Sequence, residues 1–232
     1  MKIIEPRIDI EQYDGIKIMK NIERACRTCY RSEDLITEDS YKNLIKNCIN
    51  RGHESVLEHE KITVRMVCDI GVYKDLTRHR FGSFSIESTR YCCYDKDKFN
   101  NEISFIKPVY YIETWKGKNA ELTSAECISY HWYDTMQKIE ESYMMMREDG
   151  ATPDMCRMIL PHSTAAEVTM TANIREWRHI LDLRTKTMSH PSIQQLLIPL
   201  LLKFQYTMPE LFESIEYNKN FPIDKYAEVG MI

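Results

Sequence analysis

Hydrophobic and polar positions alternate in two short segments of the chain, and this alternation predicts β-strands. In residues 62–68 the isoleucine, valine, methionine and cysteine fall on one face, whereas threonine and arginine fall on the other. A side-chain period of two is typical of a strand with one buried face. Residues 167–172 alternate in the same way and predict a second strand.

Helical spacing dominates most of the remaining chain. In residues 173–184, Trp177, Ile180, Leu181 and Arg184 recur at i, i+3, i+4 and i+7 and therefore share one face of a helix. Capping residues, glycines and prolines bound the other expected helices. These cover residues 13–30, 40–51 (capped at 37–39 and ended by Gly52), 71–80, 124–148, 153–159 and 194–204, the last interrupted or bent near Pro199.

Together the elements predict an α+β fold with one modest, mostly antiparallel sheet and surrounding helices. Only seven glycines occur, so loops are expected to be few. The stretch 92–118, rich in Tyr, Asn and Lys, predicts strand and loop. No repeat or linker divides the chain, so we expect a single domain over residues 1–232. The run Met144-Met145-Met146 is interpreted as packing filler.

Composition excludes several classes of function. The 232 residues carry a net charge of −4, which argues against a general nucleic-acid binder. No apolar run approaches the ~20 residues of a membrane span, and the start lacks the apolar core of a signal peptide. We therefore expect a cytoplasmic protein with no nucleic-acid or membrane partner.

Eight cysteines in a chain of this length do not form a disulfide framework, so we expect free thiols. Cys26 and Cys29 form a C-x-x-C, but the adjacent Cys92 and Cys93 cannot supply a matching zinc pair. No βαβ pattern surrounds Cys26 and Cys29, which excludes a thioredoxin-like site. Buried structural thiols are the favoured interpretation, and no metal site is expected.

Residues 78–91 carry the clearest chemical signal, Arg-His-Arg-Phe-Gly-Ser-Phe-Ser-Ile-Glu-Ser-Thr-Arg-Tyr. Guanidinium groups bind phosphates and carbonyls with fixed geometry, and hydroxyls complete the shell of a bound anion. The block therefore suits a negatively charged, planar ligand. The alternative is a basic helix end on a solvated face.

The block resembles the signature of flavin-dependent thymidylate synthases, which is Arg-His-Arg, seven or eight residues, then Ser. Here it consists of Arg78-His79-Arg80, seven residues and Ser88, and Ser83, Arg90 and Tyr91 also fit. Matching elements in the family's order span roughly residues 50 to 195, which is most of the chain.

Three further segments carry the resemblance. Residues 52–59 match Gly-His-x-Ser/Thr-x-x-Glu-His, which implies a flavin contact at Ser55 and, second to it, at His53 and Glu58. The alternative for this segment is a polar turn that caps the strand. Asn173-x-Arg175, with His179 and Leu183-Arg184 beyond it, matches the helix that carries flavin contacts and the catalytic arginine. A charged, exposed helix face is the alternative there. On a helix, Arg175, His179 and Asp182 would fall on one side.

Arg157 lies in an apolar run before Leu160-Pro161 and matches the family's Arg-x-x-Leu-Pro. An unpaired buried charge is very costly, so this arginine needs a partner. The resemblance implies a nucleotide phosphate, and a buried salt bridge to a carboxylate is the alternative.

The resemblance implies FAD as cofactor, dUMP as substrate, and NADPH and 5,10-methylenetetrahydrofolate as co-substrates of a reductive methylation to dTMP. It also implies a homotetramer with sites shared between subunits, and Arg184 as the catalytic residue. The implied flavin contacts are Ser55, Arg78, His79, Arg80, Asn173, Ile174, Arg175 and His179. The implied dUMP contacts are Asp75, Arg78, Glu87, Ser88, Thr89, Arg90, Arg157 and Arg184.

Four positions depart from the family pattern. Ser85-Ile86 replaces the commonest Asn-Glu, and the neighbouring Glu87 would point in a different direction. Asp75 replaces Gln or Glu and is expected to face a ribose hydroxyl or another arginine. Met188 replaces a residue that is often His. A relative acting on a modified pyrimidine nucleotide, or a non-catalytic nucleotide- or flavin-binding homologue, therefore stays an alternative.

Overall fold

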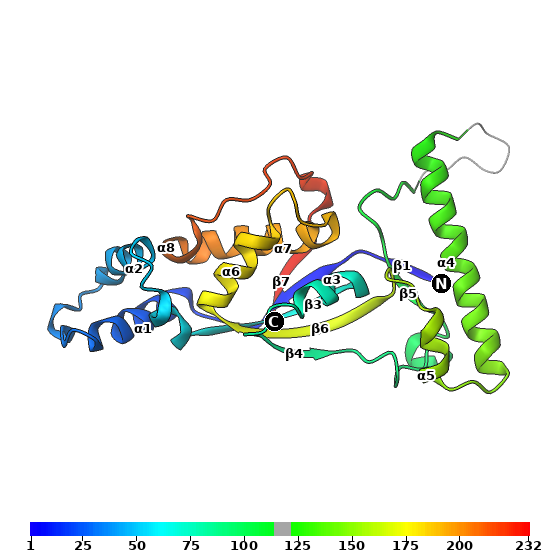
Figure 1. The fold of residues 1–232 in the computed structure, drawn as a ribbon, viewed down its shortest axis with the longest axis horizontal. Helices are drawn as coiled ribbons and strands as arrows, with labels where there is room; N and C mark the ends of the chain where they lie inside the picture. The colour runs from blue at the N-terminus through cyan, green and yellow to red at the C-terminus, as the bar shows by residue number, and fades with distance from the viewer. Residues whose placement is uncertain (114–121) are drawn as a thin grey trace. The chain divides into compact units, whose positions relative to one another are not determined.

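The structure is a computed structural model that describes residues 1–113 and 122–232 (Figure 1). Contacts between residues divide the chain into two compact units. Unit 1 comprises Met1–Pro6, Val67–Lys74 and Ile86–Val168, and unit 2 comprises Arg7–Met66, Asp75–Ser85 and Thr169–Ile232. The single domain over residues 1–232 stays a prediction. Of the strand and loop expected at 92–118, residues 114–118 lie outside the described residues.

The fold is α+β, as the sequence predicts. A five-stranded sheet has the order β4–β6–β3–β2–β7, with β2 at Arg7–Ile10, β3 at Lys61–Asp69, β4 at Ser83–Ile86, β6 at Ala165–Asn173 and β7 at Glu228–Met231. A second sheet pairs β1 (Lys2–Ile4) with β5 (Ser104–Ile106) in parallel. The sequence predicts only one sheet, because strands of three or four residues are too short to show an alternating pattern.

The pairing of β3 with β6 is antiparallel. The hydroxyls of Thr63 and Thr171 lie 2.8 Å apart, and the Ile174 N–H donates to the Glu60 carbonyl at 2.9 Å. Residue numbers thus rise along one strand while they fall along the other, which confirms the expected antiparallel arrangement for this central pair. The parallel pairing of β2 with β7 was not predicted.

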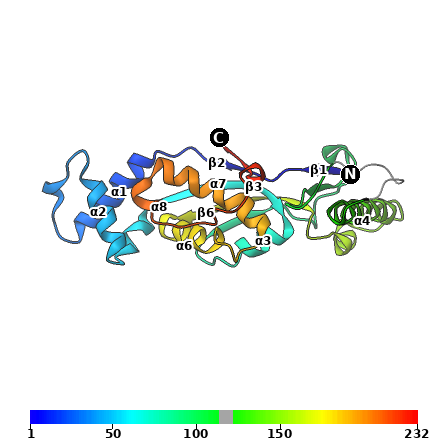
Figure 2. The same ribbon diagram turned by 90° about the horizontal axis from the view of Figure 1, so that it is seen from above.

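The helices of unit 2 pack against one another and against its strands. They are α1 (Gly15–Thr28), α2 (Ser40–Asn50), α6 (Ile174–Arg184), α7 (Pro191–Thr207) and α8 (Pro209–Phe212), with short 3-10 helices at Glu33–Leu35, Glu54–His59 and Ile223–Lys225. α7 contacts α6, α8, β2 and β7, while α1 lies beside α2 (Figures 1 and 2). Trp177, Ile180 and Leu181 of α6 are buried, as their spacing predicts.

α7 is longer than the helix expected at 194–204, and it is not interrupted at Pro199, which was one of the two outcomes expected there. It begins at Pro191, whose fixed φ and missing N–H suit a first helical position. It also runs through Pro199, although an internal proline costs about 3 kcal/mol in a helix. The apolar side chains that α7 buries on both sides of Pro199, among them Leu197 and Leu201, offset this cost.

α3 (Ile70–Leu76) is shorter than the helix expected at 71–80. The Arg78 N–H donates to the Asp75 carbonyl, and the His79 N–H donates to the Leu76 carbonyl. These bonds span three residues instead of four and tighten the chain into turns. The Arg-His-Arg sequence therefore lies in a turn beyond the helix and not at its last residues.

Unit 1 is built on α4 (Ser124–Glu148), whose bounds match the sequence prediction. A capping box between Thr123 and Glu126 fixes its start. α4 packs on a cluster of Tyr94, Ile103, Phe105, Met136, Tyr143 and Cys156. Met144 and Met146 pack against this cluster, as expected of filler, whereas Met145 is exposed.

The expected short helix at 153–159 is present as α5 (Pro153–Cys156) followed by a 3-10 turn at Arg157–Ile159. A further 3-10 turn lies at Asp97–Phe99. Within residues 1–113 and 122–232, no helix is long and apolar enough to cross a lipid bilayer. The same residues contain no group of three His, Cys, Asp or Glu side chains that could hold a metal ion. The cysteines are free thiols.

Candidate functional site

A cavity of about 750 Å³ in unit 2 gathers side chains from segments far apart in the sequence. They come from the 3-10 helix Glu54–His59, the turn after α3, α6, and the residues that follow α8. Six of the eight predicted flavin contacts line it, namely Arg78, His79, Arg80, Asn173, Arg175 and His179. Residues separated by almost a hundred positions therefore converge as the resemblance implies.

The turn after α3 divides its side chains between the interior and the cavity. His79 is buried, whereas Arg78, Arg80 and Phe81 are exposed. Among the described residues, neither Arg78 nor Arg80 has a carboxylate within ion-pair distance. Two guanidinium groups beside an aromatic ring are thus available to an anionic ligand with a planar part.

α6 presents its polar face to the same cavity. Asn173 caps the helix by accepting a hydrogen bond from the Glu176 N–H at 2.8 Å. Arg175, His179 and Asp182 all line the cavity, which confirms that they share one side of the helix. The N-terminal end of a helix favours negative charge, so this end adds to the attraction for an anion.

Carboxylates of the 3-10 helix Glu54–His59 hold two arginines of α6. Arg175 Nη1 lies 2.6 Å from Glu58 Oε1, and Arg178 Nη2 lies 3.5 Å from Glu54 Oε1. Burial lowers the pKa of Arg178, and its Nη1 also donates to the Leu211 carbonyl. One wall of the cavity therefore consists of acidic and basic side chains held by ion pairs, namely Glu54, Glu58 and Arg178.

Two predicted flavin contacts lie outside the cavity lining. Ser55 is exposed on the 3-10 helix, where Glu54 and Glu58 line the cavity instead. Ile174 is fully buried, and its N–H already donates to the Glu60 carbonyl. Ile174 is the first residue of α6, and its side chain packs in the interior where β6 passes into α6.

Arg184 is held at the C-terminal end of α6 by the turn after α3. Its Nε donates to His79 Nε2 at 3.1 Å, and its Nη2 donates to the Asp75 carbonyl at 3.0 Å. The Asp75 carboxylate lies 3.9 Å from Arg184 Nη1. This geometry confirms the alternative that Asp75 faces another arginine.

His79 is neutral in this arrangement. Burial first, and then the positive charge of Arg184, lowers the pKa of His79 to about 4. Because Nε2 accepts from Arg184, the ring proton resides on Nδ1, which lies 3.4 Å from Glu176 Oε1. Burial also raises the pKa of Glu176. The contact therefore joins a neutral imidazole to a buried carboxyl group and is not a fully charged ion pair.

Glu176 is a site residue that sequence reasoning missed. Its place three residues after Asn173 is typical of a capping box, in which the side chain would return to the helix start. The carboxyl group instead faces His79 from the interior. The sequence alone gives no sign of this contact, because it depends on where the turn after α3 lies.

The predicted phosphate contacts lie in unit 1 and converge on one carboxylate. Arg90 Nε lies 3.0 Å from Asp154 Oδ1, and Arg157 Nη1 lies 4.0 Å from the same oxygen. Asp154 therefore occupies the kind of position, between two guanidinium groups, that a phosphate would prefer.

The expectation that Arg157 lies in a buried apolar frame is wrong. Its side chain is 41% exposed, and Met158 beside it is 81% exposed. α5 and the 3-10 turn each make a single turn, so among their residues Cys156 alone is fully buried, while Ile159 is only partly buried. The alternative of a buried salt bridge is wrong for the same reason, because Asp154 is also exposed.

The remaining predicted nucleotide contacts follow β4. The Glu87 carboxylate accepts a hydrogen bond from the Glu167 N–H at 3.2 Å, so it faces the neighbouring strand. Ser88 Oγ lies 3.4 Å from the Arg90 N–H, and Thr89 is half-buried between them. The Glu87 carboxylate thus binds the backbone of the neighbouring strand and does not face a ligand site.

The cavity residues fit a flavin dinucleotide. Arg78 and Arg80 offer unpaired positive charge for a diphosphate, Phe81 offers an aromatic face, and Asn173 and His179 offer polar atoms near a ring system. A metal ion fits less well, because the carboxylates of the lining already have partners: Glu54 and Glu58 pair with arginines, Glu176 faces His79, and Asp182 pairs with Lys186.

Comparisons with known proteins identify the family of the chain. The model of the family described as "Thymidylate synthase complementing protein" matches residues 16–210. The flavin-dependent thymidylate synthase of Thermosipho melanesiensis is 29% identical over 207 residues, which are 89% of this chain and 90% of that protein. The enzyme of the same name from Haloarcula marismortui is 26% identical over 192 residues, or 77% of this chain and 76% of the relative.

Solved structures show the same fold. A UMP/dUMP methylase, PolB from Streptomyces cacaoi, bound with 5-Br dUMP, superposes with a TM-score of 0.75 at 21% identity, over 92% of this chain and 96% of that one. The same protein bound with 5-Br UMP gives a TM-score of 0.72. Because the family model spans most of its length, the chain belongs to the thymidylate synthase complementing protein family, a family of enzymes.

Proposed function

We propose that the protein is a flavin-dependent thymidylate synthase that converts dUMP to dTMP with FAD, 5,10-methylenetetrahydrofolate and NADPH. The observation that carries this proposal is the convergence of Arg78, His79, Arg80, Asn173, Arg175 and His179 on one cavity of unit 2. Arg184 is hydrogen-bonded to a residue of the same cavity, His79. Membership of the family supports the assignment.

FAD would supply the hydride that completes the methyl group. Arg78 and Arg80 would bind its phosphates, because they carry charge that no carboxylate neutralises in the described part of the chain. Glu54 and Glu58 hold Arg178 and Arg175 in fixed positions and so keep the opposite wall in place for the ring system.

Arg184 would stabilise the negative charge that develops on the pyrimidine at N3 and its neighbouring carbonyl. Two of its nitrogens are fixed by His79 and the Asp75 carbonyl, which orients the guanidinium plane before substrate binds. A donor that is already oriented needs no reorganisation during the reaction. Glu176 maintains the position of the His79 ring from behind.

Arg90 and Arg157, with Ser88, would bind the phosphate of dUMP in unit 1. Both guanidinium groups approach Asp154 Oδ1, and a phosphate would replace this single carboxylate oxygen with three acceptor oxygens. The homotetramer, the use of NADPH and folate, and a cytoplasmic location are further parts of the proposal.

A purified sample provides the decisive experiment. Incubation with dUMP, methylenetetrahydrofolate and NADPH is expected to yield dTMP, and the protein is expected to show flavin absorption. Arg65→Ala is the matched control for substitutions of the site arginines. Arg65 is an exposed arginine of unit 2 that pairs with Glu11 away from the cavity lining. A flavin-free protein without dTMP formation would remove the proposal.

A related pyrimidine nucleotide is a second candidate substrate, and one observation favours it. Ile86 stands where the family's commonest pattern has a glutamate, and Glu87 is engaged with the Glu167 backbone. A polar contact to the nucleotide is thereby lost. Parallel assays with UMP and dCMP decide between the substrates, since the preferred one will show the highest kcat/KM.

A further inference from the structure

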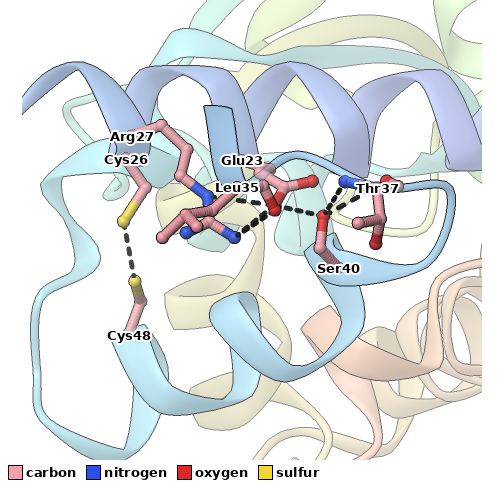
Figure 3. Close-up of polar contacts among 7 residues, drawn as sticks. All are labelled: Glu23, Cys26, Arg27, Leu35, Thr37, Ser40 and Cys48. Atoms are coloured by element: carbon pink, nitrogen blue, oxygen red, sulfur yellow. Dashed lines mark hydrogen bonds and ion pairs between the residues drawn. The ribbon is translucent and has the colours of Figure 1, made fainter. Parts of the chain in front are cut away.

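Two buried thiols meet where α1 packs against α2. Cys26 Sγ of α1 lies 3.3 Å from Cys48 Sγ of α2, although the residues are 22 positions apart in the sequence (Figure 3). Both side chains are buried, and both belong to unit 2. A disulfide bond is about 2.05 Å long, so the two sulfur atoms need to approach by only about 1.3 Å to form one.

A polar network beside the thiols holds the two helices in register. The buried Glu23 carboxylate accepts from Arg27 Nη2 at 3.0 Å and from Ser40 Oγ at 2.7 Å. Ser40 Oγ in turn accepts from the Thr37 N–H, and Arg27 Nη2 also donates to the Leu35 carbonyl (Figure 3). Because one carboxylate joins α1 to the start of α2, the thiols face each other in a fixed geometry.

We propose that Cys26 and Cys48 are a reversible oxidation site that forms an intramolecular disulfide with a low-molecular-weight disulfide as oxidant. One sulfur attacks the oxidant, which forms a mixed disulfide and releases one small thiol. The second sulfur then displaces the other small thiol. One S–S bond forms and one breaks, and the two cysteine protons leave on the two small thiols.

The local environment sets the rate of this reaction. Burial, together with the contact to Cys26, raises the pKa of the Cys48 thiol to about 12, so the thiolate is scarce at neutral pH. Oxidation is therefore slow and needs partial opening of the contact between α1 and α2. Cys29, which directly follows α1, is exposed and would react faster with added reagents, but among the described residues no other sulfur lies this close to it.

The disulfide would lie next to the segment that forms one wall of the cavity. The Cys48 carbonyl accepts a hydrogen bond from the His53 N–H at 2.8 Å, and the 3-10 helix Glu54–His59 begins immediately after His53. This 3-10 helix also contacts α1. Oxidation would thus restrain the chain that supplies Glu54 and Glu58 to the cavity.

The experiment uses the full-length protein and oxidised glutathione as the probe. After treatment, free thiols are blocked with N-ethylmaleimide and the protein is digested for mass spectrometry. The expected result is a peptide pair linked through Cys26 and Cys48, removed by dithiothreitol. The Tm is expected to rise by several degrees, because the cross-link restricts the unfolded chain.

Variants separate this pair from the other thiols. Cys26→Ala and Cys48→Ala must each abolish the linked peptide, whereas Cys29→Ser, the matched control directly after α1, must retain it. If both alanine variants fail to fold, the wild-type peptide map alone decides the question. A map that shows only glutathione adducts, or Cys29 linked to another cysteine, overturns the proposal.

Discussion

The arginines of the two units are held in different ways. In unit 2, Arg184 is 18% exposed and donates to a buried imidazole and a backbone carbonyl. In unit 1, Arg90 and Arg157 are 55% and 41% exposed and share one exposed carboxylate. Exposed ion pairs contribute only about 0–1 kcal/mol, whereas hydrogen bonds to charged groups contribute about 1.5–3 kcal/mol. The guanidinium group of Arg184 is therefore oriented before ligand binds, while those of unit 1 depend on the ligand for their order.

The largest expected effect comes from Arg184→Ala. Loss of an oriented donor to a developing negative charge typically lowers kcat by about 10²–10³. Fold and flavin content should be retained, because Arg184 does not itself line the cavity proposed to bind the flavin. Rates of dTMP formation and absorption spectra measure the two effects, with Arg65→Ala as control. Near-normal turnover of the variant would remove Arg184 from the catalytic role.

The next largest effect is on stability at acidic pH. His79 has a folded-state pKa of about 4, below its ordinary value of 6.5. As pH falls from 6.5 to 4, the unfolded chain binds a proton that folded His79 does not, so stability decreases; above pH 6.5 the contribution is constant. The free energy of unfolding should fall by up to about 3 kcal/mol over this range.

His79→Gln isolates this contribution, since glutamine can still accept from Arg184 but does not titrate. The variant should lose less stability between pH 6.5 and 4 than the wild type, as measured by urea unfolding. Arg184, His179 and Asp75, the other charged neighbours, are unchanged in both proteins. Glu176, whose raised pKa acts in the opposite direction, is also common to both. Parallel pH profiles of the two proteins would contradict a buried neutral imidazole.

Substitutions in unit 1 should affect nucleotide binding alone. Arg90→Ala and Arg157→Ala are each expected to raise the Kd for dUMP about tenfold, because each removes a charged donor to phosphate. Calorimetric titration measures this effect. Deoxyuridine, which lacks the phosphate, should bind equally weakly to all three proteins. A similar loss for deoxyuridine would place these arginines elsewhere than at the phosphate.

The smallest effect concerns the carboxylate between those arginines. Asp154→Asn should change the free energy of unfolding by less than about 1 kcal/mol, because the pairs are exposed. The affinity for dUMP should rise a few-fold at low salt, since a competing negative charge is removed. Asp134→Asn is a matched control, because Asp134 is a partly exposed carboxylate of the same unit and pairs with Lys138. Weaker binding by Asp154→Asn would show that the carboxylate orients the arginines.

Long, strongly periodic elements could be predicted from the sequence, and short ones could not. α4 matches its expected bounds, and β3 was found through its alternation, because many residues repeat one pattern in each. β1 and β7 have only three or four residues, and their pairing depends on partners far away in the chain. The bounds of α7 were misjudged, because Pro199 suggested an interruption or a bend, whereas the helix continues through this residue in buried surroundings.

For the candidate site, it was easier to predict which residues belong to it than how buried they are and what they contact. The arginines of 78–80 and 175 could be assigned to one cavity by resemblance, and the structure brings them together. Arg157 was expected in the interior, since an apolar sequence cannot reveal that a single turn leaves its methionines in solvent. Glu176 was missed, because its contact with His79 depends on a turn whose position no local pattern determines.

The parallel pairing of β2 with β7 has a consequence for synthesis of the protein. β7 is synthesised long after β2, because the two strands lie far apart in the sequence. Until then one edge of the nascent sheet has unsatisfied backbone groups, which can pair with another chain. Contacts of such long sequence separation also form slowly. Yield from cells should therefore improve at reduced growth temperature or with added chaperones, which protect that edge while the ribosome finishes.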